Sequence, residues 1–254
     1  EGQFQGLAYV AVDLAGNVYV TEYDNHRVQK FSPDGRFLAT WGSPGRREGR
    51  FGLPYGIAVD KDGNVYVTET FAYRVQKFDA DGRFLATWGS KGRRDGQFMG
   101  PHGLAVDKDG NVYVTDVRLH RVQKFSPDGR FLTKWGSKGR RDGQFRRPQG
   151  VAVDSSGNVY VSEFDGHRIQ KVTSDGRFLA KWGSKGSAEG RFLRPIGVAV
   201  DASATVYIAD SGNHRIQEFT PDGDFLATWG SKGSGDGQFQ GPLVEHGCGD
   251  HVVD

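Results

Sequence analysis

Apolar and polar residues alternate along this chain in short blocks of about five residues. In the stretch 95–141 the blocks are Gly103–Asp107, Asn111–Thr115, Arg121–Phe125 and Phe131–Trp135. The first is short and apolar, the second is rich in β-branched and aromatic residues, and the third alternates with a period of two. These patterns are typical of β-strands. We therefore expect four short strands in this stretch.

Tight-turn sequences separate the blocks. Asp107–Asn111 reads Asp-Lys-Asp-Gly-Asn, and Ser126–Arg130 reads Ser-Pro-Asp-Gly-Arg. Glycine supplies the positive φ that a tight hairpin needs, and Asp and Asn favour such turns. Consecutive strands should therefore pair in antiparallel hairpins.

The same four blocks recur with a period of 47 residues. The tryptophans show the period most clearly, at Trp41, Trp88, Trp135, Trp182 and Trp229. The five complete units are 1–47, 48–94, 95–141, 142–188 and 189–235. Units of four antiparallel strands, repeated around an axis, are the construction of a β-propeller. The sequence predicts an all-β propeller over residues 1–242, with five complete blades and an irregular tail at 243–254.

A sixth unit begins but is not completed. Residues 236–242 repeat the start of a unit, and residues 243–254 lose the pattern. The first unit is also irregular, because Leu7-Ala8-Tyr9 stands where the others have Pro-x-Gly. Two arrangements remain open: a five-bladed ring, or a six-bladed ring whose last blade is incomplete.

The repeated motifs resemble those of a known family. The units share, with some variation, Pro-x-Gly, Ala-Val-Asp, Val-Tyr-Val and a His-Arg-Val/Ile-Gln segment. The last segment is clearest at Asn25–Gln29 and Asn213–Gln217. This combination resembles the NHL repeat over residues 1–242. The resemblance implies that the loops between blades, and those joining second and third strands, open on one face. It also implies that this face binds ligands, because some NHL propellers bind RNA there.

The loops joining second and third strands differ from unit to unit, whereas the opposite turns are nearly constant. Variable tips on a constant frame are typical of a binding surface, although tips also drift after duplication. We predict a non-catalytic binding scaffold that recognises a protein or peptide through this face. The predicted ligand-binding residues are Tyr23, His26, Phe71, Tyr73, Arg118, His120, Phe164, His167 and His214.

Basic residues gather in the interblade loops of the first three units. They are Arg46, Arg47, Lys91, Arg93, Arg94, Lys138, Arg140 and Arg141, followed by Arg146 and Arg147. Basic groups interleaved with aromatic rings can bind single-stranded nucleic acid, so RNA binding by this arc is the alternative prediction. The competing interpretation is that the arginines form solvated ion pairs with Glu48, Asp95 and Asp142.

Two repeated sets of charges are expected to be structural. An acidic residue and an arginine bracket every variable loop, as Glu69 and Arg74 do, which suggests a clamp. The aspartate that ends each inner strand, such as Asp107, should form a local turn with backbone N–H groups. An EF-hand reading of Asp107–Arg118 fails, because its twelfth position is arginine in place of glutamate.

Catalytic and metal-binding motifs are missing from the sequence. It contains no Gly-x-Ser-x-Gly, Walker or His-Glu-x-x-His motif. We expect the inner strands to present Gly, Ala, Val, Leu and Ile to the axis. We therefore predict no enzyme, no cofactor and no metal; a hydrolase or lyase centred on the channel is the third alternative. His246, Cys248 and His251 in the tail have ligand chemistry but no predicted geometry.

Composition adds little to this picture. The net charge is +2 and the single cysteine excludes an intrachain disulfide. No run of about 18 apolar residues is present, so no membrane span is predicted. The repeats indicate tandem duplication, and nothing in the sequence indicates a compartment or an oligomeric state.

Overall fold

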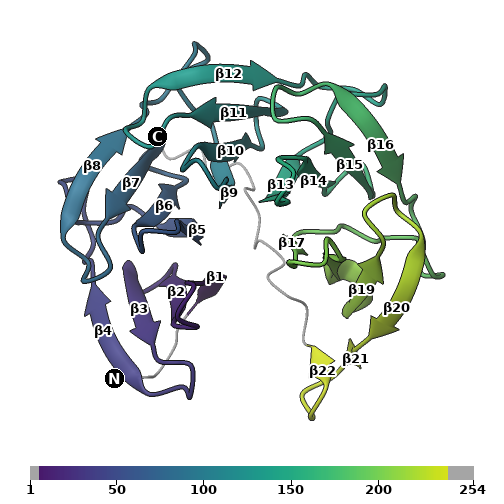
Figure 1. Ribbon diagram of the computed structural model, residues 1–254, viewed down its shortest axis with the longest axis horizontal. Helices are drawn as coiled ribbons and strands as arrows, with labels where there is room; N and C mark the ends of the chain where they lie inside the picture. The colour runs from purple at the N-terminus through teal and green to yellow at the C-terminus, as the bar shows by residue number, and fades with distance from the viewer. Residues whose placement is uncertain (1–5, 240–254) are drawn as a thin grey trace, which may run out of the picture.

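The computed structural model describes residues 6–239 and consists of five four-stranded sheets arranged around an axis (Figure 1). Blade 1 contains β1 (Leu7–Val12), β2 (Val18–Glu22), β3 (Arg27–Phe31) and β4 (Phe37–Trp41). Blade 2 contains β5 (Pro54–Val59), β6 (Val65–Glu69), β7 (Arg74–Phe78) and β8 (Phe84–Trp88). Blade 3 contains β9 (Pro101–Val106), β10 (Val112–Asp116), β11 (Arg121–Phe125) and β12 (Phe131–Trp135).

Blade 4 contains β13 (Pro148–Val153), β14 (Val159–Glu163), β15 (Arg168–Val172) and β16 (Phe178–Trp182). Blade 5 contains β17 (Val198–Val200), β18 (Val206–Asp210), the short 3-10 helix η1 (Ser211–Asn213), β19 (Arg215–Phe219) and β20 (Phe225–Trp229). Strands within each blade pair in chain order and antiparallel, with the first strand innermost. The predicted all-β propeller with five four-stranded blades is confirmed.

Each pair of neighbouring blades is held together by the same apolar interface. Between blades 1 and 2, Tyr19 and Val28 of the first blade pack against Ile57, Val67 and Phe78 of the second. Equivalent residues form the next three interfaces. A blade therefore buries one face against the preceding blade and the other against the following one, as in other repeat proteins.

The crossovers between blades also repeat. Four isolated parallel bridges close the interblade loops, for example Pro44 with Phe51. The phenylalanine then enters the interface, where a Cβ on Gly42 would lie 2.5 Å from the ring of Phe51. After blade 5 the same bridge appears as the two-stranded pair β21 (Ser231–Lys232) and β22 (Gln238–Phe239).

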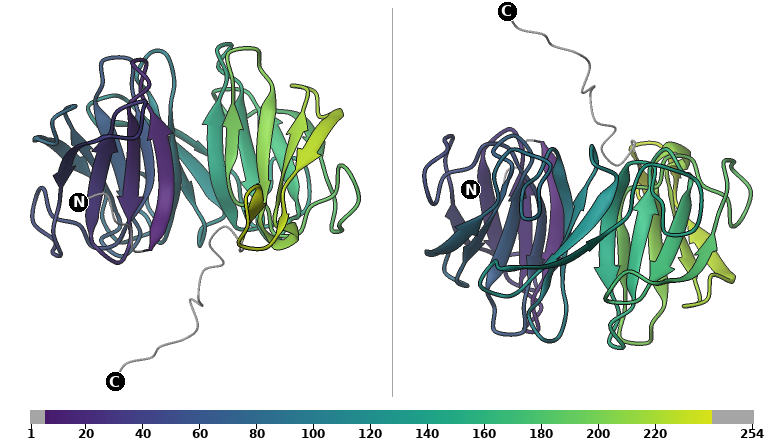
Figure 2. Two further views of the ribbon diagram at one scale, coloured as in Figure 1. Left: turned by 90° about the horizontal axis from the view of Figure 1, so that it is seen from below. Right: turned by 90° about the horizontal axis from the view of Figure 1, so that it is seen from above.

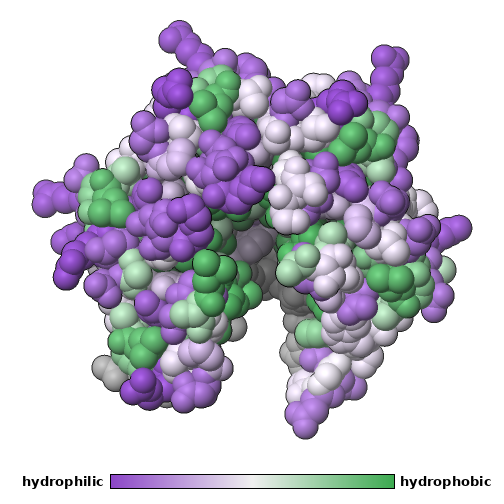
Figure 3. Space-filling model, in the orientation of Figure 1, coloured by the Kyte–Doolittle hydropathy of each residue, from purple (hydrophilic) through white to green (hydrophobic). Residues whose placement is uncertain are grey.

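Blade 1 and blade 5 do not meet. Inner strands contact one another in the order β1, β5, β9, β13 and β17, and Figure 1 shows an opening between β1–β4 and β17–β20. The space-filling view shows the same opening as a notch through the rim (Figure 3). The side views show the blades standing side by side, with loops projecting from both faces (Figure 2).

Candidate functional site

The loop face is held in place by a buried clamp in blades 1, 2, 4 and 5. In blade 3 Arg121 donates only to backbone carbonyls of the preceding interblade loop, and its Nε has no hydrogen-bond partner. In blade 2 the fully buried carboxylate of Glu69 accepts a hydrogen bond from Arg74 Nε at 2.5 Å. The other guanidinium nitrogens of Arg74 donate to the backbone carbonyls of Arg46, Arg47 and Arg50 in the preceding interblade loop. The arginine therefore joins its own blade to the loop that enters it, which is the structural role expected from the sequence.

The histidines predicted to bind ligand also have structural contacts. His26, His120 and His167 adopt positive φ values between 52° and 54°, a conformation unusual for residues other than glycine. The backbone N–H of Arg147 donates to Nδ1 of His120 at 3.0 Å, and that of Arg194 donates to Nδ1 of His167 at 3.1 Å. These rings therefore fix the end of the following interblade loop. Tyr73 and His214 share the same backbone conformation.

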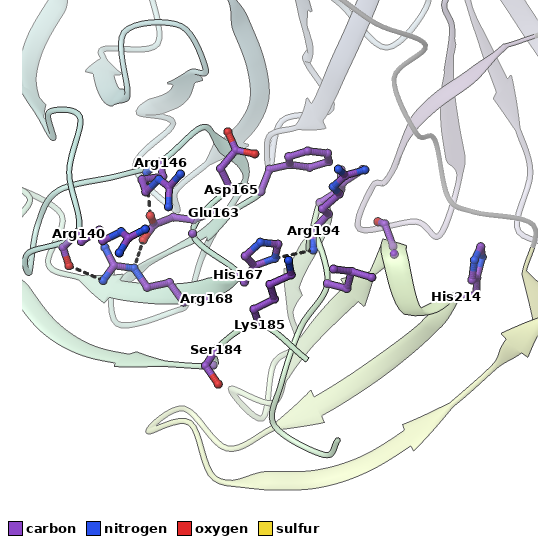
Figure 4. A pocket seen from close by; sticks show the side chains of 17 residues that line it. Arg140, Arg146, Glu163, Asp165, His167, Arg168, Ser184, Lys185, Arg194 and His214 are labelled. Atoms are coloured by element: carbon purple, nitrogen blue, oxygen red, sulfur yellow. Dashed lines mark hydrogen bonds and ion pairs between the residues drawn. The ribbon is translucent and has the colours of Figure 1, made fainter. Parts of the chain in front are cut away.

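A cavity of about 960 Å³ opens on the loop face between blades 4 and 5 (Figure 4). Its cationic lining comes from two interblade loops and from the first residue of β15. These residues are Arg140, Arg146, Arg168, Lys185 and Arg194, with His167 and His214 beside them. Its acidic lining is limited to Glu163 and Asp165, and Glu163 is already paired with Arg168.

A second cavity of about 530 Å³ adjoins the first between blades 3 and 4. It shares Arg146 and Asp165 with the first cavity, and its other charged residues are Arg118, Lys138 and Arg147. Together the two cavities are lined by eight arginine and lysine side chains and by only two carboxylates. We call this lining the basic groove.

An aromatic ring lies between two arginines in the basic groove. The guanidinium carbons of Arg147 and Arg194 lie 4.7 and 5.5 Å from the ring centroid of the buried Phe164. Both arginines adopt a positive φ of 54°. A positive φ costs free energy in a residue with a side chain, so the surrounding contacts must hold both arginines in place.

The groove also lowers the basicity of its histidines. Burial and the nearby Lys138 lower the pKa of His120, and burial and Lys185 lower the pKa of His167. A neutral imidazole is required for Nδ1 to accept the backbone hydrogen bonds described above. The positive charge of the groove therefore comes from arginine and lysine.

The basic residues predicted from the sequence divide into two groups. Lys138, Arg140, Arg146 and Arg147 line the basic groove. The remainder are exposed on interblade loops outside the two cavities: Arg46, Arg47, Lys91, Arg93, Arg94 and Arg141. Lys185 and Arg194 line the groove but were not among the predicted basic residues, although Arg194 lies 47 residues after Arg147 and occupies the same place in its unit.

The predicted aromatic residues do not form one surface. Tyr23 packs edge-on against Tyr55, and Lys91 lies over the ring of Tyr73 at 5.4 Å. Phe164 is covered by its two arginines. Phe71 is 44% exposed on blade 2 and does not line either cavity.

The residues of the inner strands differ from the sequence-based expectation of an aliphatic axis. The residue between proline and glycine in the inner strands is polar or aromatic in three blades, as Tyr55, His102 and Gln149. The rings of Tyr55 and His102 come from different blades, yet their centroids lie 3.8 Å apart. The expectation of a purely aliphatic axis was wrong because it considered only the residues after the glycine.

The inner-strand aspartates form the expected local turns. Oδ1 of Asp107 accepts hydrogen bonds from the backbone N–H groups of Asp109 and Asn111, and Oδ2 accepts one from the hydroxyl of Tyr113. Among residues 6–239 there is no group of three or more His, Cys, Asp or Glu side chains suited to a metal. His246, Cys248 and His251 of the tail, whose side chains have ligand chemistry, lie outside the described residues.

These features define a β-propeller with a basic groove on its loop face. Residues 4–31, 98–125, 145–172 and 192–219 match the NHL repeat family. The chain is therefore an NHL-repeat β-propeller. No curated protein sequence matches it significantly.

Solved propellers share the fold at low sequence identity. Virginiamycin B lyase from Staphylococcus aureus is 17% identical, with a TM-score of 0.66 over 88% of this chain and 70% of its own. A gluconolactonase from Xanthomonas campestris is 20% identical, with a TM-score of 0.65 over 89% and 76% of the two chains. A chain of the nidogen/laminin complex is 18% identical, with a TM-score of 0.65 over 87% and 79%.

The prediction that the protein is not an enzyme is contradicted by these comparisons. Two of the similar structures are a lyase and a gluconolactonase. At 17–20% identity the likeness shows the fold alone. Missing sequence motifs therefore do not exclude catalysis in this fold. In residues 6–239 no helix has the length and apolar character needed to span a membrane.

Proposed function

We propose that this propeller binds an acidic segment of another protein in the basic groove of blades 3 to 5. The observation that carries the proposal is the charge of the groove. Eight cationic side chains face two carboxylates there, whereas the whole chain has a net charge of only +2. Concave sites lined by one sign of charge attract and orient ligands of the opposite sign.

The construction of the groove supports a preorganised binding site. The clamp arginines, exemplified by Arg168, tie the loops to buried carboxylates, and Phe164 is held between Arg147 and Arg194. Arginines that are already positioned lose less conformational entropy when they bind a carboxylate. One of the similar structures, from the nidogen/laminin complex, is a propeller in a protein complex.

The aromatic rings favour a peptide over single-stranded RNA. Binding of unpaired bases depends on rings that are free to stack. Phe164 and Tyr73 already have cations over their rings, and the 44%-exposed Phe71 lies outside the groove. The groove therefore offers charge and hydrogen-bond donors but no described stacking platform.

Fluorescence anisotropy with three labelled probes tests the proposal: a glutamate-rich peptide, its glutamine counterpart and a short single-stranded RNA. We expect the glutamate peptide to bind, the glutamine peptide not to bind, and the affinity to fall between about 50 and 200 mM salt. The double variant R146S/R194S should lose binding. The matched variant R46S/R47S, on exposed loop arginines outside the groove, should retain it.

Two results would reject the proposal. Equal binding of the glutamate and glutamine peptides would show that charge does not drive recognition. RNA binding that is tighter than peptide binding and lost in R146S/R194S would make the groove a nucleic-acid site.

A further inference from the structure

Three pairs of exposed arginines are presented in the same way by the first three interblade loops. The backbone carbonyls of each pair accept hydrogen bonds from the arginine that begins the third strand of the following blade, as those of Arg46 and Arg47 do from Arg74. The backbone of each pair is therefore fixed, while the side chains remain exposed to solvent. We call these residues the arginine arc: Arg46, Arg47, Arg93, Arg94, Arg140 and Arg141.

The carboxylates next to the arginine arc do not neutralise it. Asp95 follows the second pair and binds Lys134, and Asp142 follows the third pair and binds Lys181. Among residues 6–239, no ion pair joins an arginine of the arc to a carboxylate. The arc therefore keeps its positive charge, in contrast to the solvated ion pairs considered from the sequence.

One exposed aromatic ring lies among these cations. Phe71 is 44% exposed in the loop between β6 and β7. This loop contacts the first two interblade loops, because a Cβ on Gly52 would lie 3.4 Å from Ala72 and Lys91 lies 5.4 Å over the ring of Tyr73. The residues equivalent to Phe71 in the other blades are Asp24, Arg118, Asp165 and Gly212. A single apolar side chain therefore stands between the first two arginine pairs.

The arginine arc lies at one level along the axis of the ring. Its three loops close with the same parallel bridge, and the blades that carry them stand side by side (Figure 2). Because a propeller repeats its units by rotation about the axis, equivalent side chains have similar heights. Cations at one height are complementary to a flat anionic surface. The surface of a bilayer that contains anionic lipids attracts clusters of basic residues, and aromatic rings favour its headgroup region.

We propose that the arginine arc and Phe71 bind the surface of an anionic lipid bilayer. The guanidinium groups interact with lipid phosphates and carboxylates, and the ring of Phe71 enters the headgroup region. The contact is peripheral and needs no membrane-spanning segment. It shares only Arg140 with the basic groove, so it is independent of peptide binding there.

The same residues are less suited to single-stranded RNA, although RNA also carries phosphates. Unpaired bases bind to successive aromatic rings that are free to stack. Phe71 is one ring, and the neighbouring Tyr73 already has Lys91 over it. The arc therefore offers charge and one apolar side chain, which is the combination that a bilayer surface requires.

Cosedimentation with lipid vesicles tests the proposal. The probe vesicles contain phosphatidylcholine with about 30% phosphatidylserine, and vesicles of phosphatidylcholine alone are the control. We expect the full chain to sediment with the first vesicles and to remain in solution with the second. Binding should weaken between about 50 and 200 mM salt, because the charges of the contact are screened.

Two variants that remove the same number of charges test where the bilayer binds. R46S/R47S/R93S/R94S should weaken vesicle binding by more than about a hundredfold, because each cation near the surface adds to the attraction. R36S/R83S/R130S/R177S removes four exposed arginines from the turns of the opposite face and should bind the vesicles normally. Both variants should unfold at nearly the same urea concentration as the unaltered chain, because the side chains that they shorten are exposed.

The contribution of Phe71 is tested in the same way. F71S should weaken vesicle binding by about tenfold, because it removes the apolar side chain that enters the headgroup region. L14S is the matched control, since Leu14 is 87% exposed in a turn on the opposite face, and it should bind normally.

Three results would overturn the proposal. The first is equal loss of vesicle binding in the two four-arginine variants, which would show a response to net charge alone. The second is F71S binding as tightly as the unaltered chain. The third is binding of a single-stranded RNA that R46S/R47S/R93S/R94S abolishes, without binding to the anionic vesicles, which would make the arc a nucleic-acid site.

Discussion

The backbone N–H of Arg147 donates a hydrogen bond to Nδ1 of His120, with 3.0 Å between the two nitrogens. The bond crosses from the variable loop of blade 3 to the end of the loop that enters blade 4. It exists only while the imidazole is neutral, and burial together with Lys138 lowers the pKa of His120 accordingly. The same relationship joins His167 to Arg194 in the next blade.

Stability should therefore fall as the solution becomes acidic. The unfolded chain binds protons at an ordinary histidine pKa of about 6.5, whereas the folded chain binds them only at lower pH. The stability that the two neutral histidines contribute is fully present above the histidine pKa of the unfolded chain. It is lost as the pH falls below that value toward the lower histidine pKa of the folded chain. Urea titrations at several pH values should show that the free energy of unfolding falls less with acidification in H120Q/H167Q than in the unaltered chain. An equal loss in both would contradict this account.

The clamp between Glu69 and Arg74 should be important for folding. Replacing Arg74 with methionine leaves the fully buried Glu69 without its cation and the preceding loop without its hydrogen bonds. We expect a loss of about 3 kcal/mol in the free energy of unfolding, measured with urea. R83M is the matched control, because Arg83 is the partner of Asp79 in a largely exposed ion pair. It should change the free energy of unfolding by less than about 0.5 kcal/mol.

Two equivalent glycines should respond differently to alanine. G35A and G129A both place alanine at a φ between 82° and 85°, so both incur backbone strain. Only at Gly129 does the new methyl group meet a tryptophan, Trp88. Thermal unfolding should show that G129A is less stable than G35A by about 1–3 kcal/mol. Equal destabilisation of the two variants would mean that Trp88 moves away from the new methyl group without a loss of stability, which would contradict the prediction.

The turn aspartates should act through hydrogen bonds. Burial opposes ionisation of Asp107, but hydrogen bonds from Asn111 and Tyr113 outweigh it and lower the pKa of the carboxyl. We expect D107A to reduce the free energy of unfolding by about 2 kcal/mol. Calcium should leave the unfolding midpoint of the unaltered chain unchanged. A midpoint that rises with calcium would show that these carboxylates are ligands.

Sequence reasoning succeeded where one unit contains the whole interaction. The turn around Asp107 and the pairing of Glu69 with Arg74 each join residues close together in the chain, so their spacing predicts their contacts. The antiparallel pairing of consecutive strands could be predicted for the same reason, because hairpins pair neighbouring segments. Repetition then extended each local prediction to all five blades.

Features that depend on two blades were harder to predict. Arg147 and Arg194 belong to different interblade loops, and only the packing of blade 4 brings both onto Phe164. The groove therefore lies over blades 3 to 5, whereas counting charges in the loops indicated blades 1 to 3. The repeated Arg before Pro148 and Pro195 was the one signal that would have indicated this position.

Hydrogen exchange with and without a saturating glutamate-rich peptide tests the central claim most directly, because it reports where the ligand binds. The account predicts slower exchange in the segments 138–147, 164–168 and 185–194, which line the basic groove, and no change in the loop 43–52. Protection of the loop 43–52 or of the turns on the opposite face, with the groove unchanged, would contradict it.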